Sequence, residues 1–294
     1  MMKEKLKTPT TKFASYTKSY MSFFSPLNIL IAFAMGILPA LLWLWFWLHE
    51  DSLHPEPKKI IIITFIVGML ATIPALFGES YVCGLFTETS SAGNFLTNIG
   101  LGAANDFKID CIGTSFVGNL ALLVVILWVV IEEVVKFGAV YVSALWRKEN
   151  NEPIDSLIYF ITGALGFSAA ENSLYLLSAL STDGSAIQSI VLGNFRFLGA
   201  TLLHTVSTGA IGLALALSYF KPRWLRSSAV IIGVIIAIAL HTMFNLFILR
   251  SDDGNFLATF GFVWLASIVL LLFFEKVKVV HQKYYSTEPI TPTL

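Results

Sequence analysis

The sequence predicts an all-α fold: a polytopic transmembrane helix bundle of about seven spans, with an active site buried between spans 3 to 6. Composition is the first reason, because the 294-residue chain is 56% apolar and only 13% charged, a balance typical of membrane proteins. Length is the second, because the apolar residues fall in runs of roughly 20, which a helix needs to cross a bilayer. The third reason is that consecutive runs in the middle of the chain contain ionisable side chains.

The predicted spans divide the chain into three parts. The candidate spans are Leu27 to Leu48, Ile60 to Phe77, Leu120 to Trp146, Ile154 to Leu180, Phe197 to Phe220, Ser227 to Leu249 and Phe256 to Phe274. Residues 1–26 form a Lys-rich N-terminal segment, residues 27–280 the transmembrane domain and residues 281–294 a C-terminal tail. Inside the domain, residues 79–118 are rich in Gly, Ser, Thr and Asn and form a polar loop.

Basic residues predict the orientation of the later spans. They follow the third, fifth and seventh spans: Arg147 and Lys148, then Lys221, Arg223 and Arg226, then Lys276, Lys278 and Lys283. Because basic loops remain in the cytosol, these ends are cytoplasmic and the loop 79–118 is extracytosolic. Alternating the spans backwards from these ends places the Lys-rich N-terminus outside. This conflicts with the rule that basic segments remain in the cytosol, so the orientation of the first span stays open. Cys83 and Cys111 both lie in the polar loop, as a disulfide or as two thiols.

Ionisable residues gather in the interior of spans three to six. They are Glu132, Glu133, Lys136, Glu171, His204 and His241. A charge at the bilayer centre costs about 2.5 to 3.5 kcal/mol, so each such residue suggests a function and a partner. The predicted orientation places the glutamates and histidines at a similar depth in the outer half of the bilayer. Helical spacing also allows Lys136 to pair with either neighbouring glutamate.

Two chemistries use such a set of side chains. Glutamate oxygens and histidine nitrogens suit zinc with one coordination position left for water, and a further carboxylate can act as general base on that water. Without metal, a buried and partly protonated glutamate can activate water with help from histidine. Either arrangement predicts amide hydrolysis inside the membrane. The sequence has no H-E-x-x-H or Gly-x-Gly-Asp motif and no basic, aromatic pattern for a nucleic-acid partner.

Non-enzymatic interpretations remain open at this point. Taken singly, a glutamate pair in a span is more often part of an ion path or a structural pair, and a single histidine more often hydrogen-bonds within the bundle. As a set, the same residues also suit a proton- or ion-coupled transporter, which would show ion flux without proteolysis. A membrane scaffold, the third interpretation, would tolerate substitution of these glutamates and histidines.

The order of several short motifs resembles that of the PrsW family of intramembrane proteases, which is distantly similar to the type II CAAX prenyl endopeptidases. The motifs are Pro55 to Lys58, Glu132-Glu133-x-x-Lys136, Asp155-x-x-x-Tyr159, Gly166-Phe167-x-x-x-Glu171-Asn172-x-x-Tyr175, Arg196 ahead of His204 and Gly212, and His241-x-x-x-Asn245. The resemblance extends from about residue 35 to about residue 250.

The resemblance implies an intramembrane, metal-dependent protease with a membrane-anchored substrate such as an anti-sigma factor. The expected location is the cytoplasmic membrane if the protein is bacterial. By position, Glu132 and Glu133 would be catalytic, and Lys136 and Asn245 are expected to assist them, with Lys136 tuning the glutamate pair. Glu171, His204 and His241 would be ligands of a metal ion, with zinc as the expected cofactor. Asn245 would help at an oxyanion or at the metal.

Overall fold

The computed structural model describes residues 26–51, 55–86, 119–182, 196–250 and 256–287, and its regular elements are helices. The elements are α2 (Pro26–Glu50), α3 (Lys58–Leu70), α4 (Thr72–Phe86), α6 (Asn119–Val140), the π-helical turn η3 (Tyr141–Leu145), α7 (Pro153–Thr182), α9 (Ala200–Leu217), α10 (Arg223–Arg250) and α11 (Phe256–Thr287). The predicted all-α bundle is therefore confirmed.

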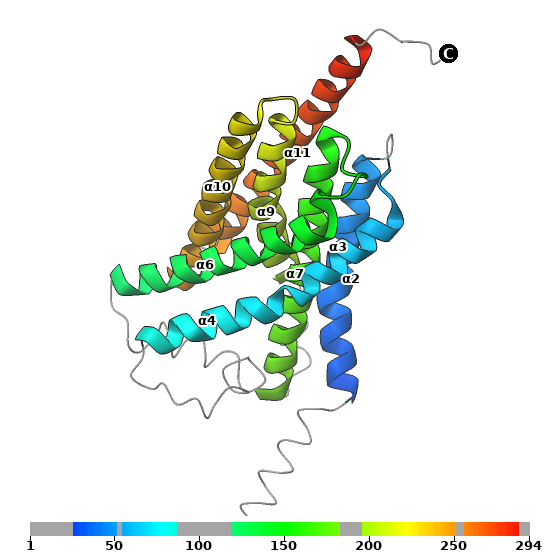
Figure 1. Ribbon diagram of the computed structural model, residues 1–294. Helices are drawn as coiled ribbons and strands as arrows, with labels where there is room; N and C mark the ends of the chain where they lie inside the picture. Colours follow the sequence, from blue (N-terminus) through cyan, green and yellow to red (C-terminus); the bar gives the residue numbers. More distant parts are fainter. Residues whose placement is uncertain (1–25, 52–54, 87–118, 183–195, 251–255, 288–294) are drawn as a thin grey trace, which may run out of the picture.

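Helix α7 forms the centre of the bundle (Figure 1). It is buried along nearly all of its predicted span and packs against α2, α3 and α9. Small residues allow this close packing, as the sequence predicted. A methyl group on Gly166 would collide with the carbonyl oxygen of Phe65 on α3, and one on Gly36 of α2 would collide with Ser173. Close helix contacts of this kind are typical of membrane bundles.

The chain is a multi-pass membrane protein. Its described part contains six helices long and apolar enough to cross a bilayer: Pro26–Glu50, Lys58–Leu85, Pro153–Leu177, Arg196–Leu217, Arg223–Ile248 and Leu257–Val279. They coincide with all predicted spans except the third. That span, Leu120 to Trp146, forms α6 and η3 and carries three charged residues in its interior, so composition alone does not place α6 among the six.

Helices α4 and α6 lie side by side and run across the direction of α7 and α2 (Figure 1). Val82 and Cys83 of α4 pack against Val124 and Trp128 of α6. This packing explains why α4 continues to Phe86, into the segment predicted as a polar loop from residue 79. Cys83 is disulfide-bonded, whereas Cys111 and residues 87–118 lie outside the described part of the chain.

Carboxylates gather where α2 ends and α7 begins. Asp155 accepts hydrogen bonds from the backbone N–H groups of Asn151 and Glu152 at 2.8 and 2.7 Å, and Tyr159 donates to Glu56. Burial raises the pKa of Asp51 to about 7, and the neighbouring negative charges of Asp155 and Glu152 contribute in the same direction. The positive charge of Lys278 acts in the opposite direction. Burial and a hydrogen bond to Asp155 raise the pKa of Glu56 to about 9. This end of the bundle therefore holds carboxyl groups that favour the protonated form.

Candidate active site between α6, α7, α9 and α10

Helix α6 carries the two adjacent glutamates and the lysine of the site. The turns of α6 before these residues pack into the protein through four buried side chains, Val124, Val125, Trp128 and Val129. This packing fixes the direction in which the polar side chains project. Glu132, Glu133 and Lys136 are themselves buried, and the side chains of Glu133 and Lys136 are 0% exposed. Lys136 Nζ lies 2.6 Å from Glu133 Oε1 and 3.7 Å from Glu132 Oε2. Helical spacing predicted that Lys136 could pair with either carboxylate, and in the structure it contacts both.

Glu133 is saturated with hydrogen bonds. Besides Lys136, its carboxylate accepts from Ser207 at 3.2 Å, from Thr208 at 2.8 Å and from Nδ1 of His241 at 2.8 Å. These donors come from α9 and α10, so a single carboxylate joins three helices. A buried charge needs such partners, because losing them leaves an uncompensated ion in an apolar interior.

The two histidines face each other with perpendicular rings, their centroids 5.1 Å apart. Nδ1 of His204 lies 3.1 Å from Lys136 Nζ, and Nε2 lies 2.8 Å from Glu171 Oε2. An ammonium group only donates and a carboxylate only accepts, so Nδ1 is the nitrogen with the lone pair and Nε2 carries the proton. By the same reasoning His241 donates from Nδ1 to Glu133, which leaves the lone pair of Nε2 directed elsewhere.

Both lone pairs lie near Oε2 of Glu132. This oxygen is 4.0 Å from His204 Nδ1 and 3.8 Å from His241 Nε2. It is buried and has no hydrogen-bond partner among the described residues. Glu132, His204 and His241 each offer one ligand atom, and these atoms all lie within 4.8 Å of one another. An oxygen and two nitrogens at this spacing fit a catalytic metal, which takes three protein ligands and keeps a position open.

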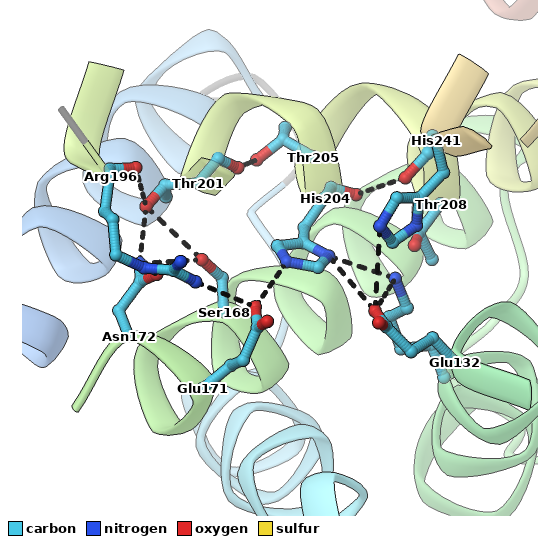
Figure 2. A network of polar contacts seen from close by, with 12 residues as sticks. Glu132, Ser168, Glu171, Asn172, Arg196, Thr201, His204, Thr205, Thr208 and His241 are labelled. Carbon is cyan, nitrogen blue, oxygen red and sulfur yellow. Dashed lines mark hydrogen bonds and ion pairs between the residues drawn. The ribbon is translucent and has the colours of Figure 1, made fainter. Parts of the chain in front are cut away.

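Glu171 lies on the far side of His204 from Glu132 (Figure 2). Its Oε2 contacts His204 Nε2 and also Arg196 Nη2, at 3.2 Å. The structure thus brings Glu132, Glu171, His204 and His241 together, as the sequence predicted, but Glu171 is outside the three-residue group that could hold a metal. Whether it acts as a ligand stays a prediction.

Asn245 lies one turn after His241 on α10 and is partly buried. Its role at an oxyanion likewise stays a prediction.

Several contacts of the site were not assigned from sequence. Ser207 and Thr208 follow His204 by three and four residues, a helical spacing that already indicated a shared face. Arg196 was one of the residues that carry the family resemblance, but its contacts with Glu171 and Asn172 were not predicted. Glu79 was placed in the polar loop, whereas in the structure it is buried on α4, with its backbone oxygen accepting from Trp128 at 3.1 Å.

Comparison with known proteins decides the family. A family model described as PrsW family intramembrane metalloprotease matches residues 56–273, well over half of the chain. The chain belongs to the PrsW family. It is similar to Protease PrsW of Geobacillus kaustophilus (strain HTA426), with 26% identity over 168 residues, which is 54% of this chain and 62% of that relative. The match therefore spans less than two thirds of the relative's length. No solved structure matches the chain.

The buried polar group described above lies wholly within the part that matches the PrsW model. The glutamate, the two histidines and their partners on α6, α7, α9 and α10 therefore belong to the segment on which the family assignment rests. They do not belong to an added domain.

Proposed function

We propose that the protein is an intramembrane endopeptidase that hydrolyses a peptide bond of a membrane-anchored protein substrate with metal-activated water. We propose zinc as the metal and an anti-sigma factor as the kind of substrate. The proposed location is the bacterial cytoplasmic membrane. The observation that carries the proposal is the group formed by Glu132, His204 and His241. One nitrogen of each imidazole lies within 4.0 Å of a buried carboxylate oxygen that has no hydrogen-bond partner among the described residues.

The charge of the site supports a bound cation. Three carboxylates, Glu132, Glu133 and Glu171, are opposed by two cations, Lys136 and Arg196. A buried carboxylate without a compensating charge is expensive, and a divalent cation would compensate it. Glutamate oxygen and imidazole nitrogen are donors that zinc accepts readily. Bound there, zinc would supply a water of lowered pKa and a Lewis acid for the scissile carbonyl.

The remaining residues of the site orient these donors. Glu133 holds Nδ1–H of His241, and Glu171 holds Nε2–H of His204, at 2.8 Å in each case. Each contact fixes the ring and its tautomer, which is how carboxylates support metal-binding histidines. Lys136 keeps a 2.6 Å bond to Glu133 and also contacts His204 Nδ1. A metal ion would take over that nitrogen, and the ammonium would remain as counter-charge to the glutamate pair.

Metal content and cleavage together test the proposal. The wild-type protein, purified in detergent, should contain about one zinc per chain and cleave a co-expressed single-span reporter. Replacing both His204 and His241 with Ala should remove the metal and the cleavage together. His49→Ala is the matched control, because His49 is exposed on α2 and stacks on Trp45 away from the site. Cleavage that continues in the double variant would contradict the proposal, as would ion flux in proteoliposomes without any proteolysis.

A further inference from the structure

The guanidinium group of Arg196 contacts three side chains of α7. Figure 2 shows two of them, Glu171 and Asn172, with Glu171 between Arg196 and His204. Nη2 lies 3.2 Å from Glu171 Oε2, and Nε donates to Oδ1 of Asn172. The group also lies over the ring of Tyr175, 4.3 Å from its centroid. Glu171, Asn172 and Tyr175 belong to α7, whereas Arg196 precedes α9, the helix that carries His204. The arginine thus joins two elements of the site.

We propose that Arg196 is a positioning residue: it fixes Glu171 against Nε2–H of His204 and through this contact strengthens metal binding by His204. The inference rests on the proposed function, because it needs His204 to be a ligand. Nothing in the proposed chemistry requires Arg196 to touch the substrate or the reacting water.

Glu171 needs such support because its side chain is 23% exposed, whereas those of Glu132 and His204 are only 4% and 3% exposed. A partly exposed glutamate has several rotamers open to it, and holding it in one of them is entropically unfavourable. The same Oε2 atom accepts from Arg196 and from His204, so the arginine holds the oxygen that orients the ring.

Arg196 itself is held in place by a polar network. Asn172, its second acceptor, donates to Thr201 at 3.0 Å and to Ser168 at 3.1 Å. Thr201 in turn donates to the backbone oxygen of Arg196 at 3.3 Å. The planar fork of an arginine matches two acceptors at once and its face stacks on an aromatic ring, which a lysine does not reproduce. The residue type therefore fits a positioning role better than a simple counter-charge.

Zinc affinity of the purified, full-length protein is the direct test, measured by titration into chelator-treated samples in detergent. Loss of a carboxylate or of another outer partner of a metal-binding histidine typically weakens binding by about 10- to 100-fold. We expect Arg196→Gln to lie in this range and Arg196→Lys to bind more tightly than Arg196→Gln. Arg226→Gln is the matched control. Arg226, on α10, also stacks on a tyrosine, but that residue is Tyr219, just after the C-terminal end of α9. This variant should bind zinc as the wild type does.

A double-mutant cycle separates positioning from a general structural role. If Arg196 acts through Glu171, adding Arg196→Gln to Glu171→Gln should weaken zinc binding no further than Glu171→Gln alone. Losses that multiply would overturn the inference, as would an Arg196→Gln variant with wild-type affinity. A loss seen only in variants whose unfolding temperature also falls would overturn it too. If Arg196→Gln does not fold, the same comparison is made with Arg196→Lys. A wild-type protein that binds no zinc would refute the proposed function itself, a distinct result.

Discussion

Replacing each of the adjacent glutamates by glutamine should give opposite outcomes, although the two substitutions are chemically identical. Glu133 accepts four hydrogen bonds or ion-pair contacts from α6, α9 and α10. Oε2 of Glu132 accepts none within the described chain, and its nearest cation is Lys136 at 3.7 Å. We therefore expect Glu133→Gln to damage the fold and Glu132→Gln to damage only the site.

The magnitudes follow from the contacts that each change removes. In Glu133→Gln, the buried ammonium of Lys136 loses its partner at 2.6 Å, and breaking a buried pair costs roughly 3 to 5 kcal/mol. In Glu132→Gln no hydrogen bond is lost and Lys136 keeps Glu133. A buried carboxylate whose cation, Lys136, lies 3.7 Å away becomes a neutral amide of the same size. The lost ion pair and the relieved burial of a charge oppose each other, so stability should change by no more than about 1 kcal/mol in either direction.

The difference in stability is measured on zinc-free protein in detergent, unfolded by heat or by denaturant. Zinc titration and reporter cleavage measure the difference at the site, and here Glu132→Gln should lose both binding and cleavage while it remains folded. Equal destabilisation by the two substitutions would refute the division of roles. Full zinc binding by Glu132→Gln would refute its place among the ligands.

Three further predictions concern packing, pH and metal. Gly166→Ala should destabilise the protein by about 1 to 3 kcal/mol or more in detergent unfolding, because its methyl group meets the carbonyl oxygen of Phe65, whereas Gly138→Ala, with nothing within 4 Å, should be tolerated. Asp51→Asn should raise the free energy of unfolding at pH 8. Measured by unfolding at a series of pH values, the difference from wild type should grow from about pH 4 to about pH 7 and then stay constant. The reason is that folding raises the pKa of Asp51 from 3.8 to about 7, so wild-type stability is lost as the carboxyl group ionises; Glu50→Gln, which removes an ion pair with Lys278, should show no such gain. Treatment with a strong chelator should stop reporter cleavage, and added zinc should restore it, as metal analysis of the same samples will show.

Much of the fold could be predicted because the bilayer imposes length and composition on each span. Five of the six helices that can cross a membrane match predicted runs to within about five residues at each end, whereas Lys58–Leu85 continues beyond the predicted end at Phe77. Gly166 confirms the predicted close packing of α7. The end of α4 could not be predicted. Glu79 and the residues after it look polar, and only the packing of Val82 on Trp128 shows why the helix continues.

The members of the site were predictable, but the arrangement of their atoms was not. Helical spacing and depth indicate that Glu132, Glu171, His204 and His241 meet, and they do. Spacing is silent on which nitrogen of each ring faces which carboxylate. That depends on χ angles and on donors from other helices, such as Thr208 on α9. A ligand role for Glu171 stays a prediction, and its contact with Nε2–H of His204 is the basis of the supporting role that we propose for it.

The geometry of a helix explains why adjacent glutamates can take different roles. Neighbouring residues on a helix point about 100° apart, so Glu132 and Glu133 of α6 enter the site in different directions. Glu133 points to the hydroxyl groups of α9 and to Nδ1 of His241, which neutralise and hold it. Glu132 then necessarily points to another part of the same site, where the other nitrogen of His241 is found, 3.8 Å away. One histidine ring thus contacts both glutamates through its two nitrogens. The hydrogen bond from Nδ1–H of His241 to Glu133 fixes the ring and leaves the lone pair of Nε2 facing Glu132. Glu133, which stabilises the fold, and Glu132, the proposed metal ligand, therefore depend on each other.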